Sequence, residues 1–297
     1  MLNSNSDIIG LQEASWKKAT GIFNSSSLDW FDSLGDEDTV AGLTASGYTC
    51  VKGEDTYGGA NSNKTMYNPI YFKTDKYTLI ANDTIWFTDA ESRYSASRID
   101  GANTDKALNY VVLEDKETGV RFIYVNVHLI VKDQDNYVHD AEGNDTEHLV
   151  QELQIIYLRE ILEDLQEQYD LPMFIGGDFN HSASKITTWF TKSVVAEDGR
   201  TIDSNGKPTE TVKVINVIQN AENVEITAPS TSTIENDKFE TRKDYTGGPI
   251  DLWFVANFEG IMHGYILDDN KNETTGKYPS DHLPATFIVT LYSEKTN

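Results

Sequence analysis

Residues 174–180 read Phe174-Ile175-Gly176-Gly177-Asp178-Phe179-Asn180, and the rest of the chain can be interpreted from them. The apolar run that begins at Met173 predicts a short strand, and the two glycines predict a tight turn close to a ligand. In an extended chain Asp178 and Asn180 would point the same way, because strand side chains alternate. A carboxylate that holds a cation or activates water, beside a carboxamide that donates to an anion, suits hydrolysis of a phosphate ester. The alternative is an Asp-x-Asn turn that satisfies its own backbone.

The composition sets limits on fold and function. The chain has 297 residues, 38% of them hydrophobic and 24% charged, which is typical of a soluble globular protein with a substantial core. Its formal net charge of −24 repels a nucleic acid backbone, so any grip on nucleic acid would have to be local and bridged by metal ions. With Cys50 as the single cysteine, an intramolecular disulfide is excluded. Since no apolar run reaches about 18 residues, we expect no stable membrane insertion.

Strand signals dominate the chain. A long helix is expected at residues 147–169, where leucine and isoleucine recur at helical spacing, and Pro172 would end it. A shorter helix is expected at residues 28–34. Apolar and alternating runs predict strands at 7–13, 67–72, 77–87, 109–114, 120–130, 173–175, 212–218, 250–256 and 285–291. We expect hairpins across residues 73–76 and 116–119, where only a short turn separates two of these strands. Neither a repeat nor a break in composition is present, so we expect residues 1–297 to form a single domain of stacked sheets with helices outside.

Five short motifs share one pattern, in which polar residues of catalytic types directly follow a strand-like apolar run. The motifs are Gln12-Glu13, Asn126-Val127-His128, Asp178-Phe179-Asn180, Asp251 and Ser280-Asp281-His282. Strand ends that meet at one rim of a sheet are where loops build active sites. We therefore expect the five motifs to converge.

Each motif has a chemical use and a structural alternative. Glu13 offers the hard oxygen that Mg²⁺ prefers, and the absence of a His/Cys cluster from the sequence also favours an oxygen-ligated metal. Asn126 and His128 would share one face of their strand, where the histidine could donate to a phosphoryl oxygen or protonate a leaving group. Taken alone, Glu13 could be a surface glutamate at a strand end, and His128 a structural histidine.

The Asp281-His282 pair leaves two arrangements open. A carboxylate beside an imidazole fixes its tautomer and favours the protonated ring. Because adjacent strand residues point apart, an acid from elsewhere such as Asp251 could orient His282, which would leave Asp281 for metal or water. A serine followed by an aspartate is also an ordinary cap or turn.

With all five motifs in this order, the chain resembles the endonuclease/exonuclease/phosphatase superfamily. That group includes deoxyribonuclease I-like nucleases, apurinic endonucleases, inositol polyphosphate 5-phosphatases and neutral sphingomyelinases. The matching segments are residues 7–13, 124–129, 175–180, 250–255 and 280–284. The resemblance spans residues 7 to 290 and implies an α/β fold, a four-layer α/β/β/α sandwich of two mainly antiparallel sheets flanked by helices.

The resemblance also implies the roles of the site residues. Glu13 would hold Mg²⁺ or Mn²⁺, and Asp281 would help to hold the metal or polarise His282. Asp178 would position or activate the attacking water, and Asn180 would bind the phosphate. His128 would stabilise the phosphoryl group or assist the leaving group, and His282 would act as general base or phosphate donor. Asp251 would orient a histidine or contribute to the metal site. Asn126 and Lys106 would contact the substrate, and Lys106 stands where many relatives place an arginine.

The expected function is that of a monomeric, divalent-metal-dependent phosphoesterase that acts on a phosphodiester or phosphomonoester by direct water attack. Its substrate would be a small phosphoester, or nucleic acid bound through divalent ions, with a phospholipid headgroup less favoured. Six residues precede Asp7, so we expect the first strand and helix of the family to be missing. The alternative function is a catalytically weakened binding module on the same fold. The acidic, nearly cysteine-free composition is typical of a bacterial secreted or surface protein, although this chain shows no signal peptide.

Overall fold

The structure is a computed structural model, and it describes only part of the chain. The described residues are 6–15, 43–54, 66–88, 92–94, 96–97, 99–102, 104–131, 137–139, 142–191, 214–226, 249–267, 282 and 284–291. The helix expected at residues 28–34 lies outside them, and so does Asp281. Among the described residues, no helix is both long and apolar enough to cross a membrane.

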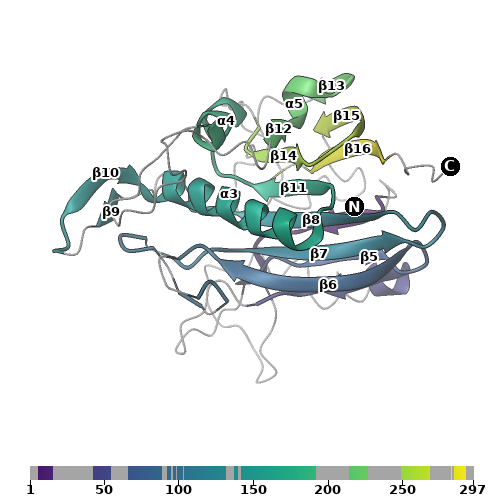
Figure 1. The fold of residues 1–297 in the computed structure, drawn as a ribbon, viewed down its shortest axis with the longest axis horizontal. Helices are drawn as coiled ribbons and strands as arrows, with labels where there is room; N and C mark the ends of the chain where they lie inside the picture. The colour runs from purple at the N-terminus through teal and green to yellow at the C-terminus, as the bar shows by residue number, and fades with distance from the viewer. Residues whose placement is uncertain are drawn as a thin grey trace, which may run out of the picture.

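A six-stranded sheet forms the centre of the fold (Figure 1). In spatial order its strands are β12 (Val214–Asn216), β14 (Asp251–Ala256), β11 (Met173–Asp178), β8 (Arg121–His128), β7 (Ala107–Asp115) and β6 (Tyr77–Trp86). Only β8 and β11 pair in parallel, and the other four pairings are antiparallel. The hairpin predicted across residues 116–119 is confirmed, because β7 and β8 pair antiparallel. The hairpin predicted across residues 73–76 is wrong, because the strand at 70–73 belongs to another sheet and β6 pairs with β7 instead.

Helices α3 (Val150–Tyr169) and α4 (Ala183–Thr191) cover one face of this sheet. Figure 1 shows α3 lying across the central strands. Strand alternation decides which side chains meet the helices: Val125 and Val127 of β8 are fully buried in the same core as Leu158 and Leu162 of α3. The helix ends where Asp170 adopts a left-handed conformation with φ 48° and its N–H bonds the Gln166 carbonyl oxygen.

The predicted start of this helix, at residue 147, is wrong, because a short strand precedes α3. Residues 145–149 form β10 (Asp145–Leu149), which pairs with β9 (Tyr137–His139). Leu149 is extended, with φ −80° and ψ 143°, so the helix begins only at Val150. The tertiary pairing of β9 with β10 thus overrides helical spacing that the sequence carries from residue 147.

Smaller sheets cover the other face of the central sheet. One contains β1 (Ile8–Gly10), β5 (Ile70–Lys73) and β3 (Tyr48–Val51); another contains β13 (Asn223–Ile226), β15 (Gly260–Leu267) and β16 (Ala285–Leu291); and β2 (Ala14–Ser15) pairs with β4 (Met66–Tyr67). They pack on the residues of β8 that alternate with the helix-facing ones, Phe122 and Tyr124. The α/β class and the two facing, mainly antiparallel β layers are therefore confirmed. On this second layer, the helical turn at 43–45 packs through Leu43 on Tyr48 and Tyr71.

The tight turn predicted at Gly176 and Gly177 is wrong, because β11 continues through both glycines to Asp178. A Cβ on Gly176 would lie 2.9 Å from the ring of Trp253, and one on Gly177 would collide with the carbonyl oxygen of Val127. Gly177 also has φ 140°, which side-chain-bearing residues rarely adopt. The glycines therefore allow neighbouring strands to pack closely on β11.

The strand predicted at 212–218 is shorter than expected, and β15 was not predicted. Asn216 ends β12, and its side-chain oxygen accepts from Ile218 N at 2.9 Å, which caps the short helix α5 (Val217–Asn220). In β15, glycines at both Gly260 and Gly264 weaken the local strand signal. Pairing with β13 and β16 compensates for that weak signal.

Candidate active site

Three of the predicted site residues form a row across the central sheet. In the strand register Asp178 lies opposite His128 on one side and opposite Asp251 on the other. This follows from topology, because β8 and β11 run parallel and end together, whereas β14 runs antiparallel and begins there. One carboxylate ends β11, another begins β14, and an imidazole ends β8, although the three residues are far apart in the sequence.

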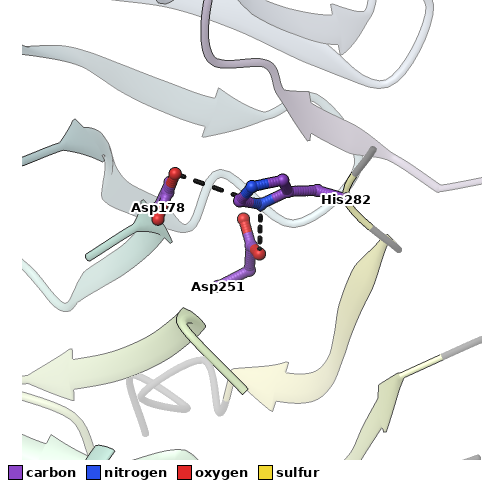
Figure 2. Close-up of side chains that lie close together, drawn as sticks. All are labelled: Asp178, Asp251 and His282. Carbon is purple, nitrogen blue, oxygen red and sulfur yellow. Dashed lines mark hydrogen bonds and ion pairs between the residues drawn. The ribbon is translucent and has the colours of Figure 1, made fainter. Parts of the chain in front are cut away.

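A second imidazole joins this row from the C-terminal part of the chain (Figure 2). His282 Nδ1 lies 2.8 Å from Asp251 Oδ2 and 4.0 Å from Asp178 Oδ2. Asp251 is therefore the described carboxylate that orients His282, as one of the two predicted arrangements requires. One ligand atom from each of Asp178, Asp251 and His282 lies within 4.8 Å of the others. Because His282 Nδ1 is already bonded to Asp251, the group is arranged to exchange protons more readily than to enclose a cation.

His128 connects the row to Glu13 and Lys106. Its Nε2 lies 3.7 Å from Glu13 Oε1 and 3.9 Å from Asp178 Oδ2. The Lys106 ammonium nitrogen lies 3.0 Å from His128 Nε2 and 3.2 Å from Nδ1. Burial, with the positive charges of Lys106 and His282 as further causes, lowers the pKa of His128 well below its ordinary value. His128 is therefore a neutral imidazole, suited to hydrogen bonding and unsuited to supplying a positive charge.

Burial also shifts the pKa values of the two charged groups that flank His128. It raises the pKa of Asp178 to about 7, and repulsion from Asp251 adds to this effect. Burial lowers the pKa of Lys106 to about 8, although attraction to Glu13 and Asp178 opposes the change. A carboxylate and an ammonium group that both titrate near neutrality, on either side of a buried imidazole, are typical of catalytic groups.

Glu13 comes from a different layer of the fold. Strand β1 ends at Gly10, and Glu13 has φ 56°, a left-handed conformation that is uncommon for a glutamate. Its side chain is 41% exposed, whereas that of Asp178 is 10% exposed. Mg²⁺ and Mn²⁺ bind one or two carboxylates and keep several waters. A partly exposed carboxylate beside a buried one fits such an ion.

Comparison with known proteins identifies the fold. Neither protein-family models nor curated protein sequences gave a match. An endonuclease/exonuclease/phosphatase family protein from Bacteroides thetaiotaomicron matches with a TM-score of 0.66 at 17% identity, covering 100% of this chain and 85% of that one. This chain has the endonuclease/exonuclease/phosphatase fold. A mannosyl-6-phosphatase from the same species matches with a TM-score of 0.62 at 16% identity, covering 98% of this chain and 87% of that one. Danio rerio TDP2 complexed with a single-strand DNA product matches with a TM-score of 0.53 at 11% identity, covering 97% and 88%.

Within this endonuclease/exonuclease/phosphatase fold, Asn180 does not follow the predicted geometry. Strand β11 ends at Asp178, and Asn180 is left-handed with φ 52°, so the two side chains are not related by strand alternation. Asn180 N donates to Asp178 Oδ1 at 2.8 Å, and Asn180 Nδ2 donates to the Leu129 carbonyl oxygen at 2.9 Å. The Asp178 Oδ1 atom thus bonds the local backbone, as the alternative of an Asp-x-Asn turn predicted. The other oxygen, Oδ2, is the one near the two histidines. Phosphate binding by Asn180 stays a prediction.

Asn126 also has a different environment from the one predicted. It shares a face of β8 with His128, as expected, but it is fully buried. Its Nδ2 donates to the carbonyl oxygens of Leu11, Asn68 and Pro69, and its Oδ1 accepts from Gln12. Its polar atoms are thus engaged within the protein, which argues against the predicted substrate contact.

Two further residues support the site and were missed in the sequence. The Tyr265 hydroxyl donates to the backbone oxygen of Asp251 at 3.0 Å, and Trp253 Nε1 donates to that of Ala285 at 3.1 Å. Tyr265 belongs to β15, the strand that the sequence did not reveal. Trp253 could have been found in the sequence, because it lies two residues after Asp251 and therefore on the same face of that strand.

Proposed function

We propose that the protein is a divalent-metal-dependent phosphoesterase that hydrolyses a phosphate ester by direct attack of water. The observation that carries this proposal is the convergence of two carboxylates, two imidazoles and one buried ammonium group on the end of β11. They come from different segments of the chain, and the successive distances from Lys106 through His128 and Asp178 to His282 are 3.0, 3.9 and 4.0 Å. The fold adds support, since solved proteins with this fold include a mannosyl-6-phosphatase and TDP2 in complex with a DNA product.

Asp178 is the group we assign to the attacking water. A general base works best when its pKa lies near the working pH, and burial raises the pKa of Asp178 to about 7. One of its oxygens accepts from Asn180 N, which fixes the carboxylate, while the other lies nearest the histidines. In this arrangement Asp178 takes the proton that water loses as the water oxygen bonds to phosphorus and the bond from phosphorus to the leaving oxygen breaks.

His282 and Asp251 form the second proton-transfer unit. Because Nδ1 of His282 is bonded to Asp251 at 2.8 Å, the proton on that nitrogen and the ring orientation are fixed. The second ring nitrogen, Nε2, is then the one that exchanges a proton with a phosphoryl oxygen or the leaving group. The Tyr265 hydroxyl holds the backbone of Asp251 and so keeps the acid in register with Asp178.

Lys106 supplies positive charge for the phosphoryl group. Its ammonium nitrogen lies 3.0 Å from His128 Nε2, and both groups are buried, where a charge acts more strongly than in water. His128, which is neutral, orients the ammonium group and can hydrogen-bond a phosphoryl oxygen. Neutral His128 is a poor proton donor to a leaving group, so that task falls to His282.

The metal would be held by Glu13, with Asp281 as the second ligand that the sequence predicts. A bound Mg²⁺ or Mn²⁺ ion would withdraw charge from the phosphoryl oxygens and the leaving oxygen. The residues around it would bind the substrate, keep the water aligned and exclude other solvent. Such an ion would also lower the pKa of a neighbouring carboxyl group such as that of Asp178.

A small phosphoester is the substrate class that the charge favours. The net charge of −24 repels long nucleic acid, and the described site contains one buried ammonium group, that of Lys106. A single phosphoryl group needs no more than this cation and a metal. We therefore place phosphomonoesters and small diesters above polymeric nucleic acid.

The test is hydrolysis of p-nitrophenyl phosphate and bis-p-nitrophenyl phosphate with Mg²⁺, with Mn²⁺ and with EDTA. We expect metal-dependent turnover that falls at least 100-fold in Asp178→Asn and in His282→Gln. His263→Gln is the matched control, because His263 also places Nδ1 near a carboxylate, 3.1 Å from Glu222, but lies on β15 and is 39% exposed. A folded protein without turnover under either metal would refute the proposal and favour a binding module.

A further inference from the structure

Asn126 joins the strand that carries His128 to the segment that carries Glu13. Its Nδ2 donates to the Leu11 carbonyl oxygen at 2.9 Å, and its Oδ1 accepts from Gln12 Nε2 at 2.6 Å. These are the two residues directly before Glu13. The same side-chain amide also donates to Asn68 and Pro69 carbonyl oxygens, at 3.0 and 3.2 Å, so it bridges three segments of the fold.

The backbone at Glu13 needs hydrogen bonds of this kind to hold its conformation. Its φ of 56° is a conformation that non-glycine residues keep only when the surroundings determine it. Residues on both sides are held: Leu11 N donates to the Pro69 carbonyl oxygen at 3.0 Å, and Ala14 pairs with Tyr67. At Gly10 a Cβ would lie 2.8 Å from Asn126 Oδ1, which shows how closely this segment lies against β8.

We propose that Asn126 is a positioning residue, which sets the Glu13 carboxylate at the distance from His128 and Asp178 that binding of a divalent cation requires. The proposal rests on the proposed function, since it takes Glu13 as a metal ligand. Asn126 acts without touching metal or substrate, by holding the two residues before Glu13 while its own strand carries His128 two positions later. Partners of metal ligands typically change metal affinity by about 10- to 100-fold when they are removed.

Asn109 provides a matched control for a purely structural effect. It lies directly opposite Asn126 in the register of β7 and β8, and it is 1% exposed where Asn126 is 0% exposed. It too bonds within the interior, donating to the Asn68 carbonyl oxygen at 2.7 Å and accepting from Thr84 at 2.6 Å. None of these contacts reaches residues 11–13. Replacing either asparagine by alanine therefore removes buried hydrogen bonds of the same kind, but only Asn126→Ala removes those to the residues before Glu13.

The experiment measures Mn²⁺ binding to the full chain by electron paramagnetic resonance and by calorimetry, without substrate. We expect Asn126→Ala to weaken Mn²⁺ binding about tenfold or more, and Asn109→Ala to leave it within about twofold, although both lower the melting temperature. Gln12→Met, which removes one hydrogen bond and retains the side-chain size, should weaken binding by a smaller factor. It also serves as the readout if Asn126→Ala does not fold.

Glu13→Gln separates this inference from the proposed function. If that variant binds Mn²⁺ as tightly as the wild type, Glu13 is no ligand, and both the metal assignment and the inference are wrong. If Glu13→Gln loses binding while Asn126→Ala and Gln12→Met retain it, the positioning role alone is overturned. Equal weakening by Asn109→Ala and Asn126→Ala also overturns it, because a general loss of rigidity would then explain both.

Discussion

Asp178 should lower the stability of the fold in order to serve the site, and its replacement by asparagine tests this. Burial and repulsion from Asp251 raise the pKa of Asp178 from an ordinary value of 3.8 to about 7. A carboxyl group whose pKa is raised in the folded state favours folding when protonated. Its contribution is therefore fully present below pH 3.8, is lost as the pH rises, and is gone above about pH 7.

The magnitude follows from the same two values. At about 1.4 kcal/mol per pH unit, the difference between 3.8 and about 7 corresponds to roughly 4 kcal/mol of lost stability above pH 7. Asparagine resembles the protonated acid in shape and retains an oxygen to accept from Asn180 N. We expect Asp178→Asn to exceed the wild type in free energy of unfolding by about 4 kcal/mol at pH 8 and by roughly 2 kcal/mol at pH 5.

Thermal unfolding at pH 5, 6, 7 and 8 in EDTA is a suitable assay, because a bound cation would lower the pKa of Asp178. For 297 residues, an entropy of unfolding of roughly 2 cal/mol/K per residue makes 4 kcal/mol equivalent to about 6 °C. Asp75→Asn, in the exposed turn between β5 and β6, is the control for replacing an aspartate outside the site. A shift that is equal at pH 5 and pH 8, or a less stable variant at pH 8, would refute the reasoning.

Three further predictions concern the site's acidity and the packing around it. The value of kcat/KM should rise as Asp178 ionises, below about pH 7 once the metal is bound, and fall above about pH 8 as Lys106 loses its proton. Lys106→Arg should remove the fall, because arginine stays charged, and a pH profile from 5.5 to 10 checks both limbs. Gly177→Ala should lower the free energy of unfolding by about 3 kcal/mol or more in urea titrations, against about 1 kcal/mol for Gly119→Ala, which is also at positive φ but has open space around it. Asn216→Ala removes the α5 cap and should lower stability by about 1 kcal/mol in the same titration.

Local pattern predicted most of the elements of this fold, and long-range pairing explains the exceptions. The run of leucines that predicted a helix to Tyr169 matches α3 at its C-terminal end, where Asp170 and Pro172 stop it. At the other end, pairing of β10 with β9 decides the boundary, and such pairing leaves no trace in the spacing of apolar residues. The sequence shows the two glycines of β11 but not why glycine is needed there, since Trp253 and Val127 approach them from strands distant in sequence.

The site residues could be predicted by type and order, but their contacts could not. Polar residues after strand-like runs pointed to His128, Asp178, Asp251 and His282, and the structure brings all four together. Which carboxylate orients His282 depended on the register of β11 and β14, which no single segment encodes. Asn126 illustrates the same limit, because its polar side chain on the His128 face is equally suited to substrate and to the Glu13 segment.

The electrostatics of the site explain why it lies between two layers of the fold. Two aspartates opposite each other in adjacent strands repel, and burial makes their charged forms less stable still, as the raised pKa of Asp178 indicates. The described groups that offset this are His282, the Asn180 N–H and Lys106. The two charged groups among them come from outside β11 and β14, from the segment before β16 and from the residue before β7. Removing either should therefore raise the pKa of Asp178 further and move the acidic limb of the activity profile to higher pH. Placing opposite charges on separate elements makes the pKa of Asp178 depend on correct assembly of both layers, so the carboxylate reaches its working range only in the folded protein.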